Sequence, residues 1–386
     1  MWRGRLSREV LRETRESYVS RDTSHLRRDE VGGAIDCALG TNPLGVAPAV
    51  RAFLRSPQEW DPAAYPSAVG EELRGKLATY LGPGVTPGQI VLGHGSFDVL
   101  THLMRLLLSA GSLLGGVSPQ FTDVPLQVML NNGRYHPVVL QPPLFEADEE
   151  SWLRAVRSHP HVLYVDRPHN PTGQVIPQEA LEKLCALGLR QGTWVVVDEA
   201  YGDYLPIEES AVRIEAPNLV VTRSFSKAWG LAGVRVGYGV IRDQELFEIF
   251  RKTQPPFSLG TPGMVLASVV LEDRDFIEAT RRYVAAAKAR VLRALGDRGE
   301  LIPSATDGRT PIVTLSAPRG DLFALMSQRG VATEPGSGYM DLDERAVRLR
   351  VPPPDDLESL EERCRSLEVP GEEGGSSDRA RGFFAP

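Results

Sequence analysis

The stretch that decides the fold lies at residues 224–237 and reads SFSKAWGLAGVRVG. It sets one lysine, Lys227, among two hydroxyl side chains and several glycines, with Arg235 eight residues further on. A lysine amine that can lose its proton forms a Schiff base with an aldehyde. Hydroxyls and a guanidinium suit a phosphate, and glycines let the backbone come close to it. The stretch therefore indicates a lysine that holds an aldehyde cofactor bearing a phosphate, although ordinary surface loops with a solvated lysine share the pattern.

The bulk composition predicts a large chain with two domains and argues against several classes of partner. With 386 residues and 42% hydrophobic content, it exceeds the size at which a single core stops growing, so we expect a large domain and a smaller one. A net charge of −7 argues against nucleic acid as a partner. The three cysteines lie far apart without zinc spacing, which indicates reduced thiols in a cytoplasmic enzyme and no metal. The longest uncharged apolar region, near 106–117, is short and broken by Ser and Gly, so no membrane span is expected.

Short runs rich in Val, Ile and Leu recur along the chain, most of them separated by stretches with helical periodicity. The runs are 89–93, 112–117, 136–141, 162–166, 194–198, 219–223 and 234–241. This alternation predicts the α/β class, with a mostly parallel sheet covered by helices. A helix is expected to start behind a Ser96 N-cap and another to span roughly 178–190.

Beyond about residue 260 the pattern changes to that of a smaller α+β domain. A helical stretch at 276–295 precedes a strand-like run at 312–316, a helix near 320–329 and a strand-like run at 346–351. The last residues have too little apolar content to fold. The expected organisation is an N-terminal arm and part of the small domain at 1–45, a large cofactor-binding domain at 46–260, a small C-terminal domain at 261–368 and a disordered tail at 369–386.

Polar residues follow the strand-like runs, and in a doubly wound fold such positions converge on one crevice. Asp198 ends a buried run, where an unpaired carboxylate is costly, so it would pair with a protonated pyridine nitrogen or else serve as a cap or loop ion pair. Asn170 precedes Pro-Thr-Gly and can present its amide to a ligand or form an Asx turn. Tyr201 could reach the same ligand or simply pack in the core. Residues 93–96, Gly-His-Gly-Ser, offer N–H groups and a helix N-terminus to an anion.

Taken together and in this order, these residues resemble the fold-type I pyridoxal-phosphate enzymes, and within them the histidinol-phosphate aminotransferase-like group of class I/II aminotransferases. The resemblance runs from about residue 35 to 367 and implies the aspartate aminotransferase-like fold. Its motifs are Asn42-Pro-Leu-Gly45, Tyr65-Pro66, the phosphate loop at 90–96, Asn170-Pro-Thr-Gly173, Asp198-Glu-Ala-Tyr201 and Ser224-Phe-Ser-Lys227.

The resemblance implies a role for each motif residue. Lys227 would be the lysine of the aldimine and the general base, and Asp198 the partner of the pyridinium nitrogen, which keeps the ring an electron sink. Cofactor contacts would also come from Tyr201, Asn170, Phe121, Gly95, Ser96, Phe97, Ser224, Ser226 and Arg235. Arg348, with Asn42, would bind the substrate. The resemblance further implies a homodimer in which Tyr65 reaches the neighbouring site.

The chain departs from the resemblance around the substrate. Members that bind histidinol phosphate tend to have an arginine where this chain has Glu334, and an acid there would repel a phosphate. The substrate is therefore expected to be an amino acid other than histidinol phosphate, whose carboxylate meets Arg348 and whose cationic or polar side chain meets Glu334. Alternatively, Glu334 forms an internal ion pair with Arg350. Arg167, with His169, replaces the usual Asn-containing lead into the turn, which indicates a rebuilt substrate pocket.

The reaction expected from the resemblance is amino transfer between an amino acid, or related amine, and a keto acid. The same cofactor also serves decarboxylases, lyases, cyclases and oxidases. These reactions are the alternatives, because the sequence does not show which substrate bond stands perpendicular to the cofactor ring. An aminotransferase-like ligand-sensing regulator is the non-enzymatic alternative. The intact set of Lys227, Asp198 and Arg235 speaks against it.

Overall fold

The computed structural model of the chain describes residues 33–57, 60–296 and 301–367. The disordered tail expected at 369–386 and residues 1–32 of the expected N-terminal arm lie outside this range. No helix in the described ranges has the length and apolar character needed to cross a membrane.

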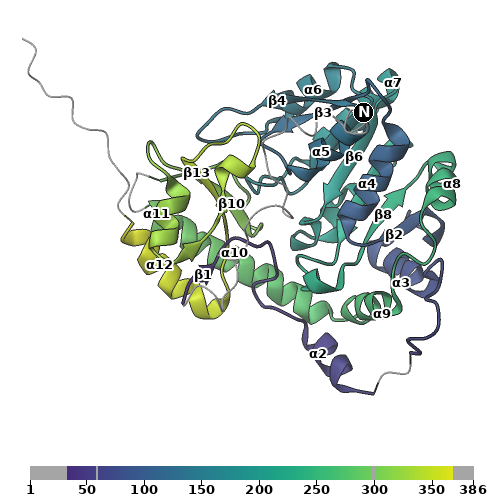
Figure 1. Ribbon diagram of the computed structural model, residues 1–386, viewed down its shortest axis with the longest axis horizontal. Coiled ribbons are helices and arrows are strands. Elements are labelled where there is room, and N and C mark those ends of the chain that lie inside the picture. The colour runs from purple at the N-terminus through teal and green to yellow at the C-terminus, as the bar shows by residue number, and fades with distance from the viewer. Residues whose placement is uncertain (1–32, 58–59, 297–300, 368–386) are drawn as a thin grey trace, which may run out of the picture.

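A seven-stranded sheet forms the centre of the larger part of the molecule (Figure 1). Its strands stand in the order β2, β8, β7, β6, β5, β3, β4, and all neighbours are parallel except those of β8. The bounds are β2 Ile90–Gly93, β3 Leu113–Ser118, β4 Arg134–Val139, β5 Val162–Asp166, β6 Trp194–Glu199, β7 Leu219–Ser224 and β8 Gly237–Ile241. All seven predicted runs are confirmed as strands of a mostly parallel sheet.

Helices cover both faces of this sheet. One face packs on α4 Ser96–Leu107, α5 Asp123–Leu130 and α8 Gln244–Thr253. The other packs on α3 Glu71–Leu81, α6 Glu149–Arg157, α7 Gln178–Gln191 and α9 Thr261–Val270, with α2 Pro48–Arg55 beside α9. Aspartates start two of these helices: the side chains of Asp148 and Asp243 accept from the backbone N–H three residues on, at 2.8 and 2.7 Å. The buried strands therefore read as continuous apolar runs because both of their faces are covered.

The start of α4 differs from the sequence prediction by one residue. Ser96 is the first helical residue, and the N-cap is Gly95, with φ +80° and no side-chain cap hydrogen bond. This positive φ disfavours a side chain, and a Cβ on Gly95 would lie 2.7 Å from Nη2 of Arg235, which would have to move. The glycine N-cap therefore lets the backbone at the start of α4 come close to Arg235, which a serine at this position would hinder.

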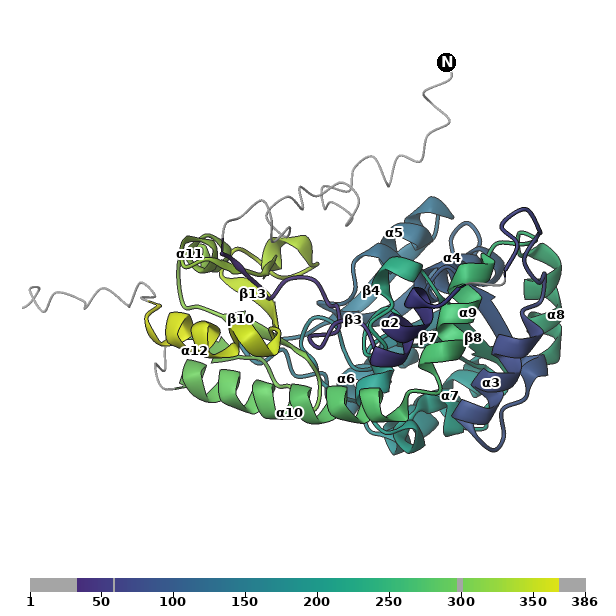
Figure 2. The ribbon, with the colours of Figure 1, turned by 90° about the horizontal axis from the view of Figure 1, so that it is seen from below.

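A smaller part of the molecule contains a four-stranded sheet in the order β12, β13, β10, β9. Its strands are β9 Ile302–Pro303, β10 Ile312–Ser316, β12 Glu334–Pro335 and β13 Ala346–Arg350, and a separate parallel pair joins β1 Ile35–Asp36 to β11 Val331–Ala332. Its helices are α10 Arg274–Gly296, α11 Leu322–Gln328 and α12 Leu357–Arg365. The strands and helices predicted in this region are confirmed, and α10 runs alongside both parts (Figure 2). The domain boundaries at 45 and 260 stay predictions.

Candidate active site

The carboxyl ends of β5, β6 and β7 carry different side chains on the two faces of the sheet. Side chains alternate along a strand, so residues two apart share a face. Tyr164 and Val196 pack under α4 and α5, which puts Asp166 and Asp198 on that side. Val165 and Val197 pack toward α6 and α7 on the opposite face. Arg167 and Glu199 follow them by two positions and therefore lie on that opposite face as well. Two polar clusters with different tasks result from this alternation.

A cavity of about 230 Å³ opens on the face of Asp166 and Asp198. Eleven residues that the sequence predicts for the site line it: Ser96, Phe97, Phe121, Asn170, Asp198, Tyr201, Ser224, Ser226, Lys227, Arg235 and Arg348. They come from the ends of four neighbouring strands, from the start of α4 and from β13 of the smaller sheet. The tertiary structure thus brings residues from positions 96 to 348 into one cavity.

One end of the cavity is built to bind an anion. Arg235 Nη1 donates to Ser226 Oγ at 3.0 Å, Ser224 Oγ lies 3.0 Å from Ser226 Oγ, and Ser96 stands at the N-terminus of α4. A helix N-terminus with hydroxyls and a guanidinium is a favourable phosphate site. Arg235 itself has φ +57°, a left-handed conformation that is costly for a residue with a side chain. In this conformation its guanidinium contacts Ser226.

Asp198 lies at another wall of the cavity, and only 6% of it is exposed. Its Oδ1 accepts from Thr222 Oγ1 at 3.0 Å and its Oδ2 from Tyr164 O–H at 3.1 Å. Burial raises the pKa of this carboxyl to about 6, against the effect of these hydrogen bonds. A cation placed in the cavity would stabilise the ionised carboxyl, and a protonated pyridine nitrogen is such a cation.

Tyr201 presents a hydroxyl that is buried and has no hydrogen-bond partner within the described chain. Lys227 Nζ lies 5.2 Å from the centre of its ring. Burial tends to raise the pKa of the hydroxyl, but the charges of Lys227 and Arg348 outweigh this and lower it. A buried hydroxyl without a partner is costly unless a ligand supplies one. The cavity therefore fits a molecule with a polar oxygen beside Tyr201.

Arg348 connects the small sheet to the turn at Asn170. Its Nη1 donates to Asn170 Oδ1 at 3.0 Å, and its Nη2 donates to the carbonyl of Ala38 at 2.6 Å. Since the amide oxygen of Asn170 is engaged in this way, its NH₂ group is left to donate into the cavity. Arg348 is 2% exposed and lines the cavity.

Four predicted site residues lie outside the cavity lining. Gly95 lies next to the guanidinium of Arg235, as described above. Asn42 does not line the cavity, and its Nδ2 donates to Ala228 O at 2.5 Å and to Thr280 Oγ1 at 3.1 Å; its contact with the substrate stays a prediction. Tyr65 is 82% exposed and stacks on Phe257 at 4.7 Å between ring centres.

The fourth is Glu334, and the alternative in which it forms an ion pair with Arg350 is wrong. Its carboxylate lies 3.8 Å from Arg348 Nη2, because Glu334 and Arg348 are direct neighbours across β12 and β13. Arg350 instead pairs with Asp36 at 3.1 Å. Glu334 is 3% exposed, so it acts on the cavity through Arg348.

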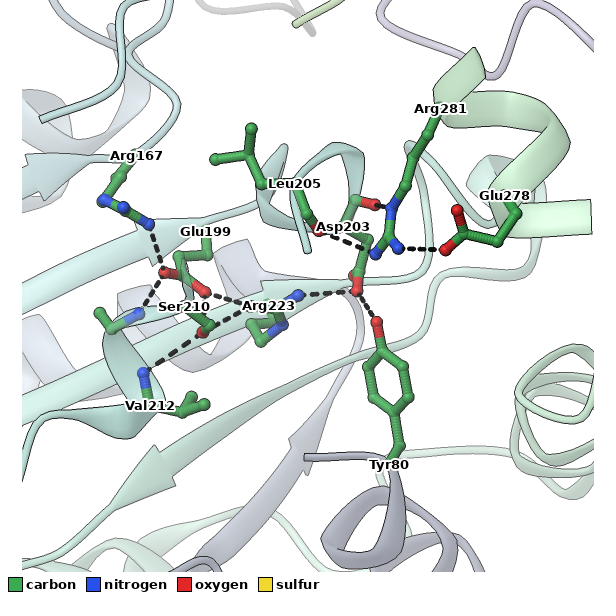
Figure 3. A network of polar contacts seen from close by, with 11 residues as sticks. Tyr80, Arg167, Glu199, Asp203, Leu205, Ser210, Val212, Arg223, Glu278 and Arg281 are labelled. Atoms are coloured by element: carbon green, nitrogen blue, oxygen red, sulfur yellow. Dashed lines mark hydrogen bonds and ion pairs between the residues drawn. The ribbon is translucent and has the colours of Figure 1, made fainter. Parts of the chain in front are cut away.

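Arg167 does not rebuild the substrate pocket, contrary to the sequence prediction. It faces away from the cavity, where it contacts Glu199, and Glu199 in turn binds Arg223 (Figure 3). Arg223 also pairs with Asp203 at 2.7 Å. Strand alternation explains the error, because Arg167, Glu199 and Arg223 each follow or precede a cavity residue by one position. His169 is likewise buried, with its Nδ1 2.7 Å from Thr172 Oγ1 and its pKa lowered to about 4 by burial.

Sequence reasoning missed five residues that line the cavity: Leu39, Gly40, Asp166, Pro168 and Ala200. Gly40 is required for packing, because a Cβ there would lie 2.8 Å from Lys227 Nζ and closer still to the Tyr201 hydroxyl. No local signal identifies it. Asp166 could have been found, since it ends a buried apolar run just as Asp198 does.

The comparisons with known proteins agree with this geometry. The sequence profile of the family "Aminotransferase class I and II" matches residues 43–367. Histidinol-phosphate aminotransferase 2 of Methylococcus capsulatus is 35% identical over 79% of this chain and 83% of its own length. Histidinol-phosphate aminotransferase 1 of Nitrosococcus oceani is 31% identical over 80% and 82%.

Solved structures extend the comparison to the fold and the cofactor. The histidinol-phosphate aminotransferase of Sinorhizobium meliloti, solved in complex with pyridoxal 5'-phosphate, superimposes with a TM-score of 0.76 at 25% identity and covers 88% of this chain and 94% of its own. An aspartate aminotransferase double mutant of Thermus thermophilus shares the fold, with a TM-score of 0.74 at 23% identity over 94% and 99% of the two chains. The anion cradle, the buried acid and the partnerless hydroxyl fit that cofactor. The chain therefore belongs to the class I and II aminotransferases and is a transferase that uses pyridoxal 5'-phosphate.

Proposed function

We propose that the chain transfers the amino group of an amino acid to a keto acid, and that the donor meets Arg348 with a carboxylate rather than with a phosphate. The observation that carries this proposal is the acid behind Arg348. Glu334 lies 3.8 Å from the guanidinium, and both side chains are buried. Its negative charge offsets part of the positive potential that an anion meets at Arg348. A carboxylate with one charge is matched to this site better than a phosphate with nearly two.

Four side chains would carry the chemistry. When bound, pyridoxal phosphate supplies an aldehyde for the amino group and an aromatic ring that accepts the electron pair left at the substrate α-carbon. Lys227 Nζ would be the base that takes the α-proton, and the Tyr201 hydroxyl would orient the amine by its dipole. Asp198 would stabilise a proton on the pyridine nitrogen. Arg348 fixes the carboxylate, so that the α-proton points toward Lys227.

A donor screen tests the proposal. We expect keto-acid-dependent turnover of at least one α-amino acid, with kcat/KM at least about tenfold above that for histidinol phosphate. The matched variants are Glu334→Gln, which removes the charge, and Glu334→Arg, which reverses it. Since added positive charge favours a dianion, the ratio of phosphate to carboxylate use should rise from wild type to Glu334→Gln to Glu334→Arg. Efficient turnover of histidinol phosphate by the wild-type protein would refute the proposal.

Histidinol phosphate is the second candidate donor. The observation in its favour is the name shared by the two curated relatives, which are 35% and 31% identical to this chain. The same screen decides between the two donors.

We further infer that the protein works as a homodimer in which Tyr65 completes the partner's site. Tyr65 and Phe257 form an exposed aromatic pair outside the cavity of their own chain. Mixing Lys227→Ala with Tyr65→Ala subunits tests this, because a mixed dimer has one site with both lesions and one site with neither. Activity should then exceed the sum of the two separate variants. Lack of any gain, with exchange of subunits verified by gel filtration of tagged chains, would contradict the inference.

A further inference from the structure

Asp166 stands beside Asp198 in the wall of the cofactor cavity. The two residues are direct Cα partners in the parallel register of β5 and β6, so their side chains lie on the same face. Both line the cavity, and they are 4% and 6% exposed. The site therefore contains two buried carboxyls on adjacent strands.

The carboxyl of Asp166 holds the loop that carries Phe121. Its Oδ2 accepts from the backbone N–H of Phe121 at 3.2 Å, and its Oδ1 accepts from Gln120 Nε2 at 2.5 Å. Gln120 is itself fixed, since its Nε2 also donates to the carbonyl of Tyr164 and its Oε1 accepts from Tyr135 O–H at 2.7 Å. These contacts set the position of Phe121, a wall of the same cavity.

The two carboxyls lack a compensating cation. In the described part of the chain, neither Asp166 nor Asp198 forms an ion pair. Burial raises the pKa of Asp166 to about 7, and the charge of Asp198 raises it as well, while the hydrogen bonds from Gln120 and Phe121 lower it. A buried negative pair of this kind is stabilised by a cation brought by the ligand.

We propose that Asp166 is a second acidic residue of the cofactor site, which holds Phe121 at the cavity wall and adds a negative charge beside Asp198 that favours the protonated form of the cofactor ring. Asp166 is a positioning residue in this proposal, since it acts through Phe121 and through the electrostatic potential of the cavity. The inference depends on cofactor binding and not on the identity of the amino donor, so the donor screen leaves it untouched.

The other titratable groups around the cavity set the background against which Asp166 acts. Tyr164 on β5 donates to Asp198, Tyr135 on β4 donates to Gln120, and burial raises the pKa of Tyr164 well above its ordinary value. The remaining charged or titratable groups of the cavity wall are Asp198, Tyr201, Lys227, Arg235 and Arg348. None of them changes in the test below.

The test compares the holoenzymes of wild type, Asp166→Asn and Glu149→Gln. Glu149 is an exposed acid paired with Lys183, so Glu149→Gln removes one charge outside the cavity. The visible absorption of the bound cofactor is titrated between about pH 5 and pH 9, a range that brackets the ionisation of the two carboxyls. Because a nearby negative charge stabilises protonated groups, Asp166→Asn should move the transition to lower pH by about one unit, and Glu149→Gln should not move it.

Affinity for the cofactor gives a second reading that does not depend on activity. Equilibrium dialysis at pH 8 should show about tenfold weaker binding of pyridoxal phosphate to Asp166→Asn, the counterpart of a shift of one pH unit. Asp166→Glu, which keeps the charge, should return the transition toward that of wild type. An Asp166→Asn protein whose transition and affinity equal those of Glu149→Gln overturns the proposal.

If Asp166→Asn does not fold, infrared spectroscopy of the wild-type protein replaces it. Burial raises the pKa of Asp166 toward neutral pH, so at pH 6.5 part of this carboxyl is protonated while the cavity is without a cation. Binding of the cofactor should ionise it, so the C=O stretch of a buried protonated carboxyl should weaken when pyridoxal phosphate is added. An unchanged band overturns the proposal as well.

Discussion

Two neighbouring tyrosines show how a single hydroxyl distinguishes a site residue from a core residue. Tyr201 and Tyr204 are stacked 6.2 Å apart, and both bury a hydroxyl without a hydrogen-bond partner within the described chain. Only Tyr201 lines the cavity. Burial raises the pKa of Tyr204, whereas the cations near Tyr201 lower that of its hydroxyl. The two residues are both buried tyrosines, but their electrostatic environments differ.

Tyr201→Phe and Tyr204→Phe therefore form a matched pair. Tyr201→Phe should weaken the binding of pyridoxal phosphate about five- to tenfold, the equivalent of one lost hydrogen bond of about 1–1.5 kcal/mol. Tyr204→Phe should leave the dissociation constant unchanged within about twofold. Fluorescence titration of the cofactor-free proteins measures both constants. Equal effects of the two substitutions would contradict the assignment of Tyr201 to the cofactor.

At the scale of elements, β5, β6 and β7 place the site on one face and a structural ion network on the other. Glu199 accepts from Arg167, Arg223, Ser210 and the N–H of Ala211, and its side chain is fully buried (Figure 3). The network joins the three strand ends next to the cavity residues. It fixes the spacing of Asp166, Asp198 and Ser224 without entering the cavity.

Breaking this network should be far more costly than breaking an exposed ion pair. Glu199→Ala leaves two buried arginines with one acceptor fewer, which should lower the free energy of unfolding by about 3–5 kcal/mol. Glu209→Ala, which removes an exposed partner of Arg309, should cost no more than about 1 kcal/mol. Urea denaturation of the two variants beside wild type measures the difference. Similar midpoints for both would show that the network contributes little.

The sequence predicted the elements of this region well but not the face that each polar residue occupies. Apolar runs identified the strands, because strands covered on both faces are continuously hydrophobic. The end of such a run does not reveal which of two successive polar residues enters the cavity. For that reason the sequence does not distinguish Arg167, which lies on the opposite face, from Asp166, which lines the cavity, since a shift of one position exchanges the faces.

At the scale of the whole molecule, Lys288 on α10 ties the smaller sheet to the Asn170 turn. Its ammonium donates to Thr306 Oγ1 at 2.6 Å, to Ile312 O at 2.5 Å and to Thr310 Oγ1 at 3.1 Å. The loop held in this way contacts the turn directly, because Thr310 Oγ1 donates to Gly173 O at 2.9 Å. Lys288 is 1% exposed, and burial lowers its pKa to about 7.

This lysine predicts a pH dependence of stability. Between pH 7 and about 10.4, the ordinary lysine pKa, the unfolded chain binds more protons at this position than the folded chain does, so the contribution of Lys288 to stability rises with pH. The urea midpoint of wild type should therefore increase from pH 7 to 8.5 relative to that of Lys288→Met. Lys252→Met, which removes an exposed lysine, should follow wild type. Parallel curves for wild type and Lys288→Met would exclude a buried titrating lysine.

The sequence by itself determined the cofactor and the fold of this protein, because both are recorded in short segments. Lys227 among its serines, the Asn170 turn, Asp198 at a strand end and the alternation of apolar runs are all local patterns. Only the tertiary structure decided the partners of Glu334, Arg350, Arg167 and Asn42 and the place of Asp166. The physical reason is that a buried charge takes the partner that long-range packing and strand register bring to it. Glu334 lies opposite Arg348 across β12 and β13, and Asp166 lies beside Asp198 across β5 and β6.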